Sequence, residues 1–312
     1  MLSSLVGRPP YAPAVAAPPL LVPLADGRAL AVDDVGDPDG APVLYLHGTP
    51  DSRLSRHPDD GVTASAGVRL LAVDRPGIGR STGHPGRTLG SAADDLAAVL
   101  ATLGIDRVVV LAWSAGAPFG AALAARHPGL VSALGLVAPL VPLTAYADAG
   151  VAEAAGPGRR LFAEMAAEMT PDDVAAEVAL YLLADPATRE AVAEQMAAEA
   201  DPARAAEVAG LPGAGQHLVA ATVEAVALGR DGLHQEVATQ AAVPDVDLAA
   251  AADGRRIVVW SGTLDEISPP AFGRWWADLL GAEHVVVADG GHALALPRWT
   301  EVLTHLTSGS EA

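Results

Sequence analysis

The sequence contains no cysteine, which excludes disulfide bonds, thiolate catalysis and cysteine-based zinc sites. Aromatic residues make up only 4% of the chain, so a core has to be built mainly from aliphatic side chains. Basic residues are also scarce: 19 lysines and arginines stand against 38 aspartates and glutamates, giving a formal net charge of −19. Nucleic acids and anionic membranes bind basic surfaces, so neither is expected as a partner.

Long hydrophobic runs are absent as well. No uninterrupted stretch of about 18 apolar residues is present, so no membrane span is expected. Residues 1–10 lack the basic start and apolar stretch of a signal peptide, and the prolines that follow would break a helix. We therefore predict an extended N-terminal arm over residues 1–20 and a cytoplasmic protein. The arm leaves a homodimer open as the oligomeric state.

The hydrophobic pattern predicts an α/β fold with a mostly parallel central sheet flanked by helices. Turn signals at residues 26–27 and 36–40 predict a β-meander over residues 20–46. From residue 43 onward, continuous apolar strands alternate with helical segments, which is typical of a parallel sheet covered on both faces. The strands expected in this part are 43–46, 70–73, 108–112, 134–137, 256–261 and 284–288, and the helices are 89–103, 115–125, 272–280 and 298–306.

The alternation is interrupted over residues 140–252, which show helical periodicity and no convincing strand. The helices expected there are 159–169, 171–183, 186–200 and 216–228. An all-helical block inside a parallel α/β pattern predicts a lid inserted over the carboxyl ends of the strands, where such folds place their sites. The predicted organisation is a core over residues 21–139 and 253–312 with a helical lid over residues 140–252.

The most informative motif ends a predicted strand at Ser114. An apolar, β-branched run stops there, and a helix of small residues begins directly after it. A buried strand that turns sharply into a helix through a serine is the geometry of a nucleophile elbow. A serine that caps the helix would give the same local pattern, so the interpretation depends on finding a base, an acid and an oxyanion site elsewhere.

Further polar motifs follow the ends of the other predicted strands. They are His47-Gly48-Thr49-Pro50, Asp74-Arg-Pro-Gly-Ile-Gly-Arg-Ser81, Ser261-Gly-Thr-Leu-Asp-Glu266 and Asp289-Gly-Gly-His292. A serine, then an acid, then a histidine is the chain order of α/β-hydrolases. With these motifs, the sequence resembles the lidded, lipase- and esterase-like members of the α/β-hydrolase fold superfamily from about residue 20 to 306, outside the lid. Ala112 departs from their Gly-x-Ser-x-Gly pattern by a methyl group.

This resemblance implies a role for each residue of the constellation. Ser114 would be the nucleophile, His292 its general base, and Asp265 the acid that fixes the imidazole tautomer. The backbone N–H groups of Thr49 and Ala115 would form the oxyanion hole.

Several neighbouring residues have a second interpretation. Glu266 is an alternative acid, and we favour Asp265 because it occupies the position of the family's acid after Gly262. His47 and Asp74 are interpreted as structural. Candidates for the substrate pocket are Trp113, Pro50, Phe162, Tyr181 and His217. Trp113 is equally consistent with packing, and apolar stripes on lid helices commonly belong to a core.

The leading functional hypothesis is a cofactor-free serine hydrolase that cleaves a small ester, thioester or lactone through an acyl-enzyme. No metal-binding motif, Walker loop or complete dinucleotide fingerprint is present, so neither a metal nor a cofactor is expected. The predicted lid and the scarcity of basic residues favour a small, uncharged or apolar substrate.

Other functions remain compatible with the fold. They include a cyclase, a lyase, an acyltransferase or a peroxidase that uses the same residues, and a binding protein without turnover. Proline iminopeptidases share the His-Gly-x-Pro motif but usually carry Gly-Gly-Ser-Trp-Gly at the elbow, and haloalkane dehalogenases use an aspartate where this chain has Ser114.

Overall fold

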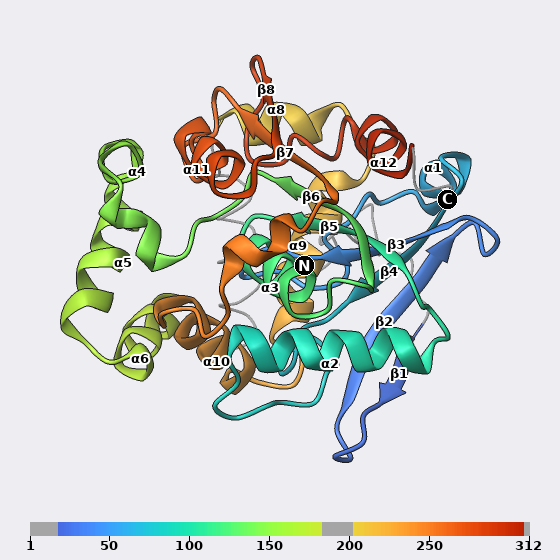
Figure 1. The fold of residues 1–312 in the computed structure, drawn as a ribbon, viewed down its shortest axis with the longest axis horizontal. Coiled ribbons are helices and arrows are strands. Elements are labelled where there is room, and N and C mark those ends of the chain that lie inside the picture. The colour runs from blue at the N-terminus through green and yellow to red at the C-terminus, as the bar shows by residue number, and fades with distance from the viewer. Residues whose placement is uncertain (1–17, 183–201, 309–312) are drawn as a thin grey trace, which may run out of the picture.

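The computed structural model describes residues 18–182 and 202–308 of the protein, built around one eight-stranded sheet (Figure 1). The strands follow the order β1-β2-β4-β3-β5-β6-β7-β8 across the sheet. Strand β2 pairs antiparallel with β1 and β4, and all the other pairs are parallel. The strands are β1 (Leu20–Pro23), β2 (Ala29–Gly36), β3 (Ala41–Leu46), β4 (Val68–Val73), β5 (Val108–Trp113), β6 (Val131–Val137), β7 (Arg256–Gly262) and β8 (Glu283–Val287).

Helices cover both faces of this sheet, as the alternating sequence pattern predicts. On β5, Val110 and Ala112 pack into the core cluster on one face, whereas Leu111 and Trp113 pack into the cluster on the other face. Because successive strand residues point to opposite faces, burial of both faces requires the continuous apolar run that the sequence shows. The flanking helices are α1 (Asp60–Ser65), α2 (Leu89–Thr102), α3 (Gly116–Arg126), α11 (Pro270–Leu280) and α12 (Trp299–Thr307).

The predicted β-meander over residues 20–46 is wrong in one respect. Strands β1 and β2 form the expected antiparallel hairpin, but β3 does not pair with β2. Strand β4 lies between them, antiparallel to β2 and parallel to β3. The turn signal at residues 36–40 marks a change of direction correctly, but the pairing partner of β2 comes from a strand more distant in the sequence.

Between β6 and β7, the described residues form helices and no strand. Helices α5 and α6 match two of the predicted helices closely, and α9 matches a third, whereas the prediction for residues 186–200 lies outside the described residues. Helices α4, α8 and α10 were not predicted. The elements are η1 (Leu143–Ala147), α4 (Ala149–Ala154), α5 (Pro157–Glu168), α6 (Pro171–Leu182), α8 (Pro202–Ala209), α9 (Ala214–Ala225), α10 (Asp231–Ala241) and η2 (Leu248–Ala252).

This helical segment divides into two parts in space. Helices α4, α5 and α6 lie at the left edge of Figure 1, where α4 packs against α11 and α6 packs against α10. Helices α8 and α9 pack against each other in a different part of the molecule. Within residues 18–182 and 202–308, no helix combines the length and the apolar character needed to cross a membrane.

Candidate functional site

Ser114 occupies a sharp turn between β5 and α3. Its φ angle of 54° lies in the left-handed region, which is rare for a residue with a side chain and marks a strained position. The turn is fixed on both sides, because the Ser114 N–H donates to the Val137 carbonyl at 2.9 Å and the Ser114 carbonyl accepts from the Leu140 N–H at 3.0 Å. This is the elbow geometry that the sequence predicts.

Small residues let the strand and the helix approach at this elbow. A Cβ atom on Gly116 would lie 2.5 Å from the Leu46 carbonyl oxygen, so no larger residue fits there. A Cβ atom on Gly120 would lie 3.0 Å from the Cβ of Ala112. The methyl group by which Ala112 departs from the family pattern is therefore accommodated by a glycine one helical turn beyond the elbow.

His292 connects Ser114 to Asp265 through two hydrogen bonds. Its Nε2 lies 3.0 Å from the Ser114 Oγ, and its Nδ1 lies 2.9 Å from the Asp265 Oδ2. All three residues are buried, with 3–4% of each exposed. The structure therefore brings together the three residues that the sequence singles out, in hydrogen-bonding order.

The acid of this trio is held rigidly. The second carboxylate oxygen of Asp265 accepts hydrogen bonds from the backbone N–H groups of Ile267 at 2.9 Å and Ser268 at 2.8 Å. Glu266, the alternative acid, is exposed, and the His292 Nδ1 is bonded to Asp265 instead. The geometry thus favours Asp265 as the partner of the imidazole.

Trp113 supports the histidine rather than the substrate pocket. Its indole N–H donates to the His292 carbonyl at 2.8 Å, and the centres of the two rings lie 5.5 Å apart. Trp113 also lines a small recess together with Tyr45 and Trp299, on the face of the sheet that α12 covers. These contacts favour the packing role that the sequence also allows for Trp113, in which it holds the His292 backbone.

Glu207 of α8 binds the loop that carries His292 from the other side. One carboxylate oxygen accepts from the Gly291 N–H at 2.7 Å, and the other accepts from the Ala293 N–H at 3.0 Å. Burial raises the pKa of Glu207 above its ordinary value, although these two hydrogen bonds oppose the shift. A single side chain from the helical segment thus fixes the backbone on both sides of the histidine.

The backbone N–H groups of Thr49 and Ala115 both lie beside the serine. Ala115 follows Ser114 directly, and a Cβ atom on Gly48, next to Thr49, would lie 3.2 Å from the Ser114 Cβ. Neither N–H donates a hydrogen bond to any residue that the structure describes. Backbone N–H groups without an acceptor, close to a nucleophile, are the kind of donor that stabilises an oxyanion.

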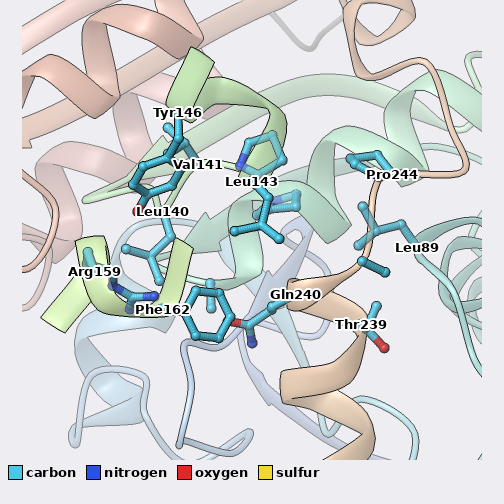
Figure 2. Close-up of a pocket in the computed structure, with 14 residues that line it drawn as sticks. Leu89, Leu140, Val141, Leu143, Tyr146, Arg159, Phe162, Thr239, Gln240 and Pro244 are labelled. Carbon is cyan, nitrogen blue, oxygen red and sulfur yellow. The ribbon is translucent and has the colours of Figure 1, made fainter. Parts of the chain in front are cut away.

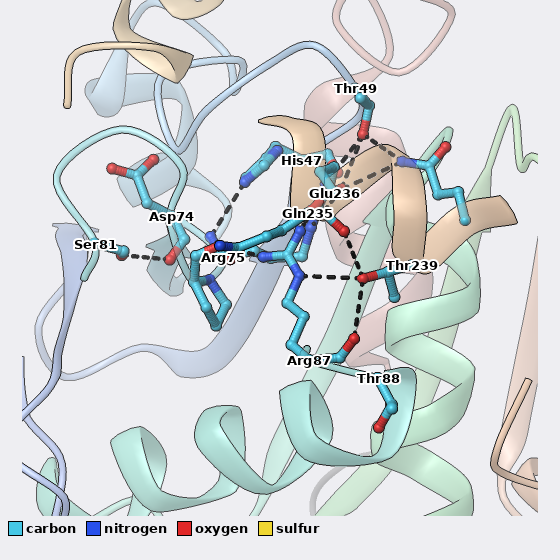
Figure 3. Close-up of polar contacts among 12 residues, drawn as sticks. His47, Thr49, Asp74, Arg75, Ser81, Arg87, Thr88, Gln235, Glu236 and Thr239 are labelled. Atoms are coloured by element: carbon cyan, nitrogen blue, oxygen red, sulfur yellow. Dashed lines mark hydrogen bonds and ion pairs between the residues drawn. The ribbon is translucent and has the colours of Figure 1, made fainter. Parts of the chain in front are cut away.

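A buried ion-pair network lies directly behind Thr49 (Figure 3). Glu236 of α10 pairs with Arg75 through one carboxylate oxygen and with Arg87 through the other, and none of the three side chains is exposed. The Thr49 hydroxyl donates to Glu236 at 2.9 Å and accepts from Gln240 at 2.9 Å. Burial opposes ionisation of Glu236, but the two arginines outweigh it and lower its pKa to about 2.

Arg75 also holds the motif that precedes Thr49. Its guanidinium donates to the carbonyl oxygens of His47 and Gly48, and its own N–H donates to the His47 Nε2. Burial, assisted by the charge of Arg75, lowers the pKa of His47 well below its ordinary value, so the ring is neutral. These contacts agree with the interpretation of His47 as a structural residue.

A small pocket of about 20 Å³ lies between the elbow and the helical segment (Figure 2). Its lining includes Ala115 and, as predicted, Phe162. The residues that line it are Leu89, Ala115, Pro118, Leu140, Val141, Pro142, Leu143, Tyr146, Arg159, Phe162, Thr239, Gln240, Ala242 and Pro244.

The other predicted pocket residues are placed differently. Pro50 does not line this pocket. His217 lies on α9 near Arg56, and burial, assisted by that charge, lowers its pKa to about 4. The side chain of Tyr181 lies outside the described residues. Pro50 and His217 therefore do not belong to the lining of this pocket, and their contact with substrate stays a prediction.

Sequence analysis missed Glu207, Glu236 and Arg159, which come from three helices of the segment over residues 140–252. No motif marks them, because each is a single charged residue on an amphipathic helix, where a solvated position is the usual outcome. Within the described part of the chain, no group of three or more histidine, aspartate or glutamate side chains is placed to hold a metal ion.

Comparison with known proteins identifies the family. The sequence model of the alpha/beta hydrolase fold family matches residues 41–298, and the chain therefore belongs to this family. Among solved structures, an esterase from Rhodococcus sp. superposes with a TM-score of 0.63 at 20% identity, covering 94% of this chain and 97% of that one. An alpha/beta hydrolase fold protein from Nakamurella multipartita gives a TM-score of 0.60 at 27% identity, over 92% and 99% of the two chains.

Curated relatives match over a shorter stretch. A probable proline iminopeptidase from Streptomyces coelicolor is 32% identical over 126 residues, which is 36% of this chain and 38% of that protein. A non-heme chloroperoxidase from Streptomyces lividans is 34% identical over 132 residues, or 41% of this chain and 47% of that protein. The matched region thus spans less than half of either relative.

Proposed function

We propose that this protein is a cofactor-free serine hydrolase that cleaves a small carboxylic ester, thioester or lactone through an acyl-enzyme. The observation that carries the proposal is the hydrogen-bonded series from Ser114 through His292 to Asp265, with the serine in a left-handed turn. A hydroxyl is a weak nucleophile at neutral pH unless a positioned base removes its proton. The 3.0 Å distance between the His292 Nε2 and the Ser114 Oγ supports His292 as this base.

In the acylation step, the Ser114 Oγ attacks the substrate carbonyl while the His292 Nε2 takes its proton. The carbonyl oxygen becomes negative and is bound by the N–H groups of Thr49 and Ala115. The imidazolium then gives its proton to the departing alkoxide or thiolate, leaving an acyl ester on Ser114. Asp265 accepts the Nδ1–H throughout, so it holds the tautomer and stabilises the imidazolium.

In the deacylation step, a water molecule takes the place of the leaving group. His292 removes a proton from this water as its oxygen attacks the acyl carbonyl. The tetrahedral intermediate collapses, the carboxylic acid departs, and the proton on His292 returns to the Ser114 Oγ. Each proton removed is thus returned within the cycle, and no further reactant is consumed.

We extend the proposal to the segment over residues 140–252, which we assign as the lid of the site. Three contacts support it: α10 reaches Thr49 through Glu236, α8 reaches the His292 loop through Glu207, and α5 lines the pocket with Phe162. A lid that excludes bulk water strengthens the electrostatic interactions around a developing oxyanion.

The experiment that tests this function compares the wild type with Ser114→Ala on p-nitrophenyl esters of increasing acyl length. Nitrophenol release by the wild type, lost in the variant while its melting temperature is kept, is the expected result. Equal activity in the two proteins would refute the role of Ser114. A single burst of nitrophenol without turnover would instead indicate an acceptor other than water, as in an acyltransferase.

A further inference from the structure

Arg159 is a cation that points into the pocket and forms no ion pair with a residue that the structure describes. It lies in the first turn of α5, and its guanidinium extends toward the space beside Phe162 (Figure 2). Its side chain is partly buried, yet it makes no hydrogen bond or ion pair with any described residue. The neighbouring Arg160 differs on both counts, because it is exposed and donates to the Ala155 carbonyl at 2.7 Å.

The surroundings of Arg159 make an unpaired charge costly. The pocket is lined mainly by apolar side chains such as Leu140, Val141 and Phe162, and Arg159 is the only charged residue among its described lining residues. Burial lowers the pKa of Arg159, opposed by Tyr146 and Asp265. A guanidinium beside apolar side chains is stabilised when an anion pairs with it, so Arg159 favours a ligand with a negative charge in this pocket.

The pocket that holds this cation adjoins the reacting atoms. Ala115, whose N–H is one of the two proposed oxyanion donors, lines it, and so does Gln240, which binds the Thr49 hydroxyl. A molecule whose carbonyl lies at Ser114 therefore extends into the space in front of Arg159. The overall charge of −19 repels anions at long range, so a local cation is what allows an anionic substrate to bind here.

We propose that the substrate of this hydrolase carries a carboxylate, which Arg159 binds while the ester carbonyl lies at Ser114. The planar guanidinium matches a carboxylate through two parallel hydrogen bonds, and its charge equals that of one carboxylate. A doubly charged phosphate would require a second cation, and the described lining of the pocket contains none. This inference rests on the proposed function and replaces the expectation of an uncharged substrate.

The test uses two esters that differ only at the far end of the acyl chain: p-nitrophenyl hexanoate and the mono-p-nitrophenyl ester of adipic acid. Each rate is corrected for hydrolysis without enzyme. In Arg159→Gln, kcat/KM for the adipate ester should fall about 10- to 100-fold, chiefly through KM, because charge-assisted hydrogen bonds are lost. The hexanoate ester should change by less than about twofold, and Arg159→Lys should restore part of the loss.

Arg160→Gln is the matched control, since it removes the same charge from the same helix at an exposed position. It should leave both esters unaffected. Equal losses on both esters in Arg159→Gln would show a structural role for Arg159, and no loss on the adipate ester would show that it binds no carboxylate. Either result overturns the proposal.

A failure of the proposed function is recognised separately. If the wild type hydrolyses neither ester, the stabilisation of the protein by monomethyl adipate and by methyl hexanoate is compared by thermal unfolding, in the wild type and in Arg159→Gln. A rise in melting temperature with monomethyl adipate alone, lost in Arg159→Gln, supports the carboxylate site without hydrolysis. The absence of such a rise overturns the site as well.

Discussion

The substitution Glu207→Gln is expected to lower kcat while leaving stability nearly unchanged, because Glu207 contacts the loop that carries His292. The carboxylate accepts from two backbone N–H groups, on Gly291 and Ala293. A glutamine amide has one oxygen, so it satisfies one of these donors and turns its own NH₂ group toward the other. Ala293 is 1% exposed, so water cannot readily replace the lost acceptor.

The expected size of the fall in kcat follows from the position of this loop, which carries the base His292. A displacement of about 1 Å in a catalytic group can cost about 100-fold in rate, and release of one of two anchors allows a fraction of that movement. We expect kcat to fall about 10-fold with KM nearly unchanged, because Glu207 does not touch the substrate. The unfolding free energy should change by less than about 1 kcal/mol. The raised pKa of Glu207 shows that the cost of burying its charge exceeds the gain from its two hydrogen bonds, so replacing the carboxylate by a neutral amide loses little stability.

The pH dependence has a definite sign. Because the pKa of Glu207 in the folded protein is raised above its ordinary value of 4.5, its contribution to stability is present below that value and is lost as pH rises through the folded pKa. The ionised form is the stronger acceptor for the two N–H groups, so kcat should gain as Glu207 ionises. The difference in kcat between the wild type and Glu207→Gln should therefore narrow in acid.

The assay is steady-state hydrolysis of the preferred nitrophenyl ester, from about pH 5 to about pH 8, alongside urea unfolding. Glu164→Gln is the control, because it makes the same chemical change at an exposed position on α5. A kcat of Glu207→Gln within twofold of the wild type would refute the positioning of His292 by Glu207. A ratio of the two kcat values that stays constant with pH would refute it as well.

Three further results are expected. Asp265→Asn should lower kcat by about 10⁴-fold through the wrong imidazole tautomer, with Glu266→Gln nearly unaffected, and the reverse order in the kinetics would reassign the acid. Glu236→Gln should cost about 3 kcal/mol in urea unfolding, because two buried guanidinium groups lose their counter-charge, and a loss below about 1 kcal/mol would contradict this. The pKa of His217 is lowered from 6.5 to about 4, so the free energy of unfolding of the wild type should fall by about 2 kcal/mol between pH ~7 and pH ~5. Thermal unfolding of His217→Asn should lack this fall.

The core of the fold was predictable because its signals are local. Each parallel strand is a short apolar run, and helix α2 repeats apolar residues at helical spacing, so element type follows from nearby residues. The position of β3 was not predictable in the same way. Turn residues at 36–40 report that the chain reverses, but the pairing of β2 with β4 depends on residues 68–73, which the turn does not specify.

In the candidate site, too, the residues in local motifs were predictable and those placed by packing were not. Ser114, Asp265 and His292 stand in motifs at strand ends, and the fold brings strand ends to one edge of the sheet, so their meeting could be inferred. Arg159 and Arg160 show the limit. They are adjacent in sequence and identical in type, yet one points into the pocket and the other to solvent, and only the packing of α5 separates them.

The proposed lid supplies parts of the site, and these parts differ in how firmly they are held. Helix α10 is anchored through Glu236, which is fully buried between two arginines, so moving it would expose three unpaired charges. Helix α8 is held to the His292 loop by Glu207, which is only partly buried. The contact of α10 with Thr49 through Glu236 is therefore held more firmly than the contact of α8 with the His292 loop through Glu207. A movement of α8 would therefore loosen the support of His292 while Glu236 keeps its place beside Thr49.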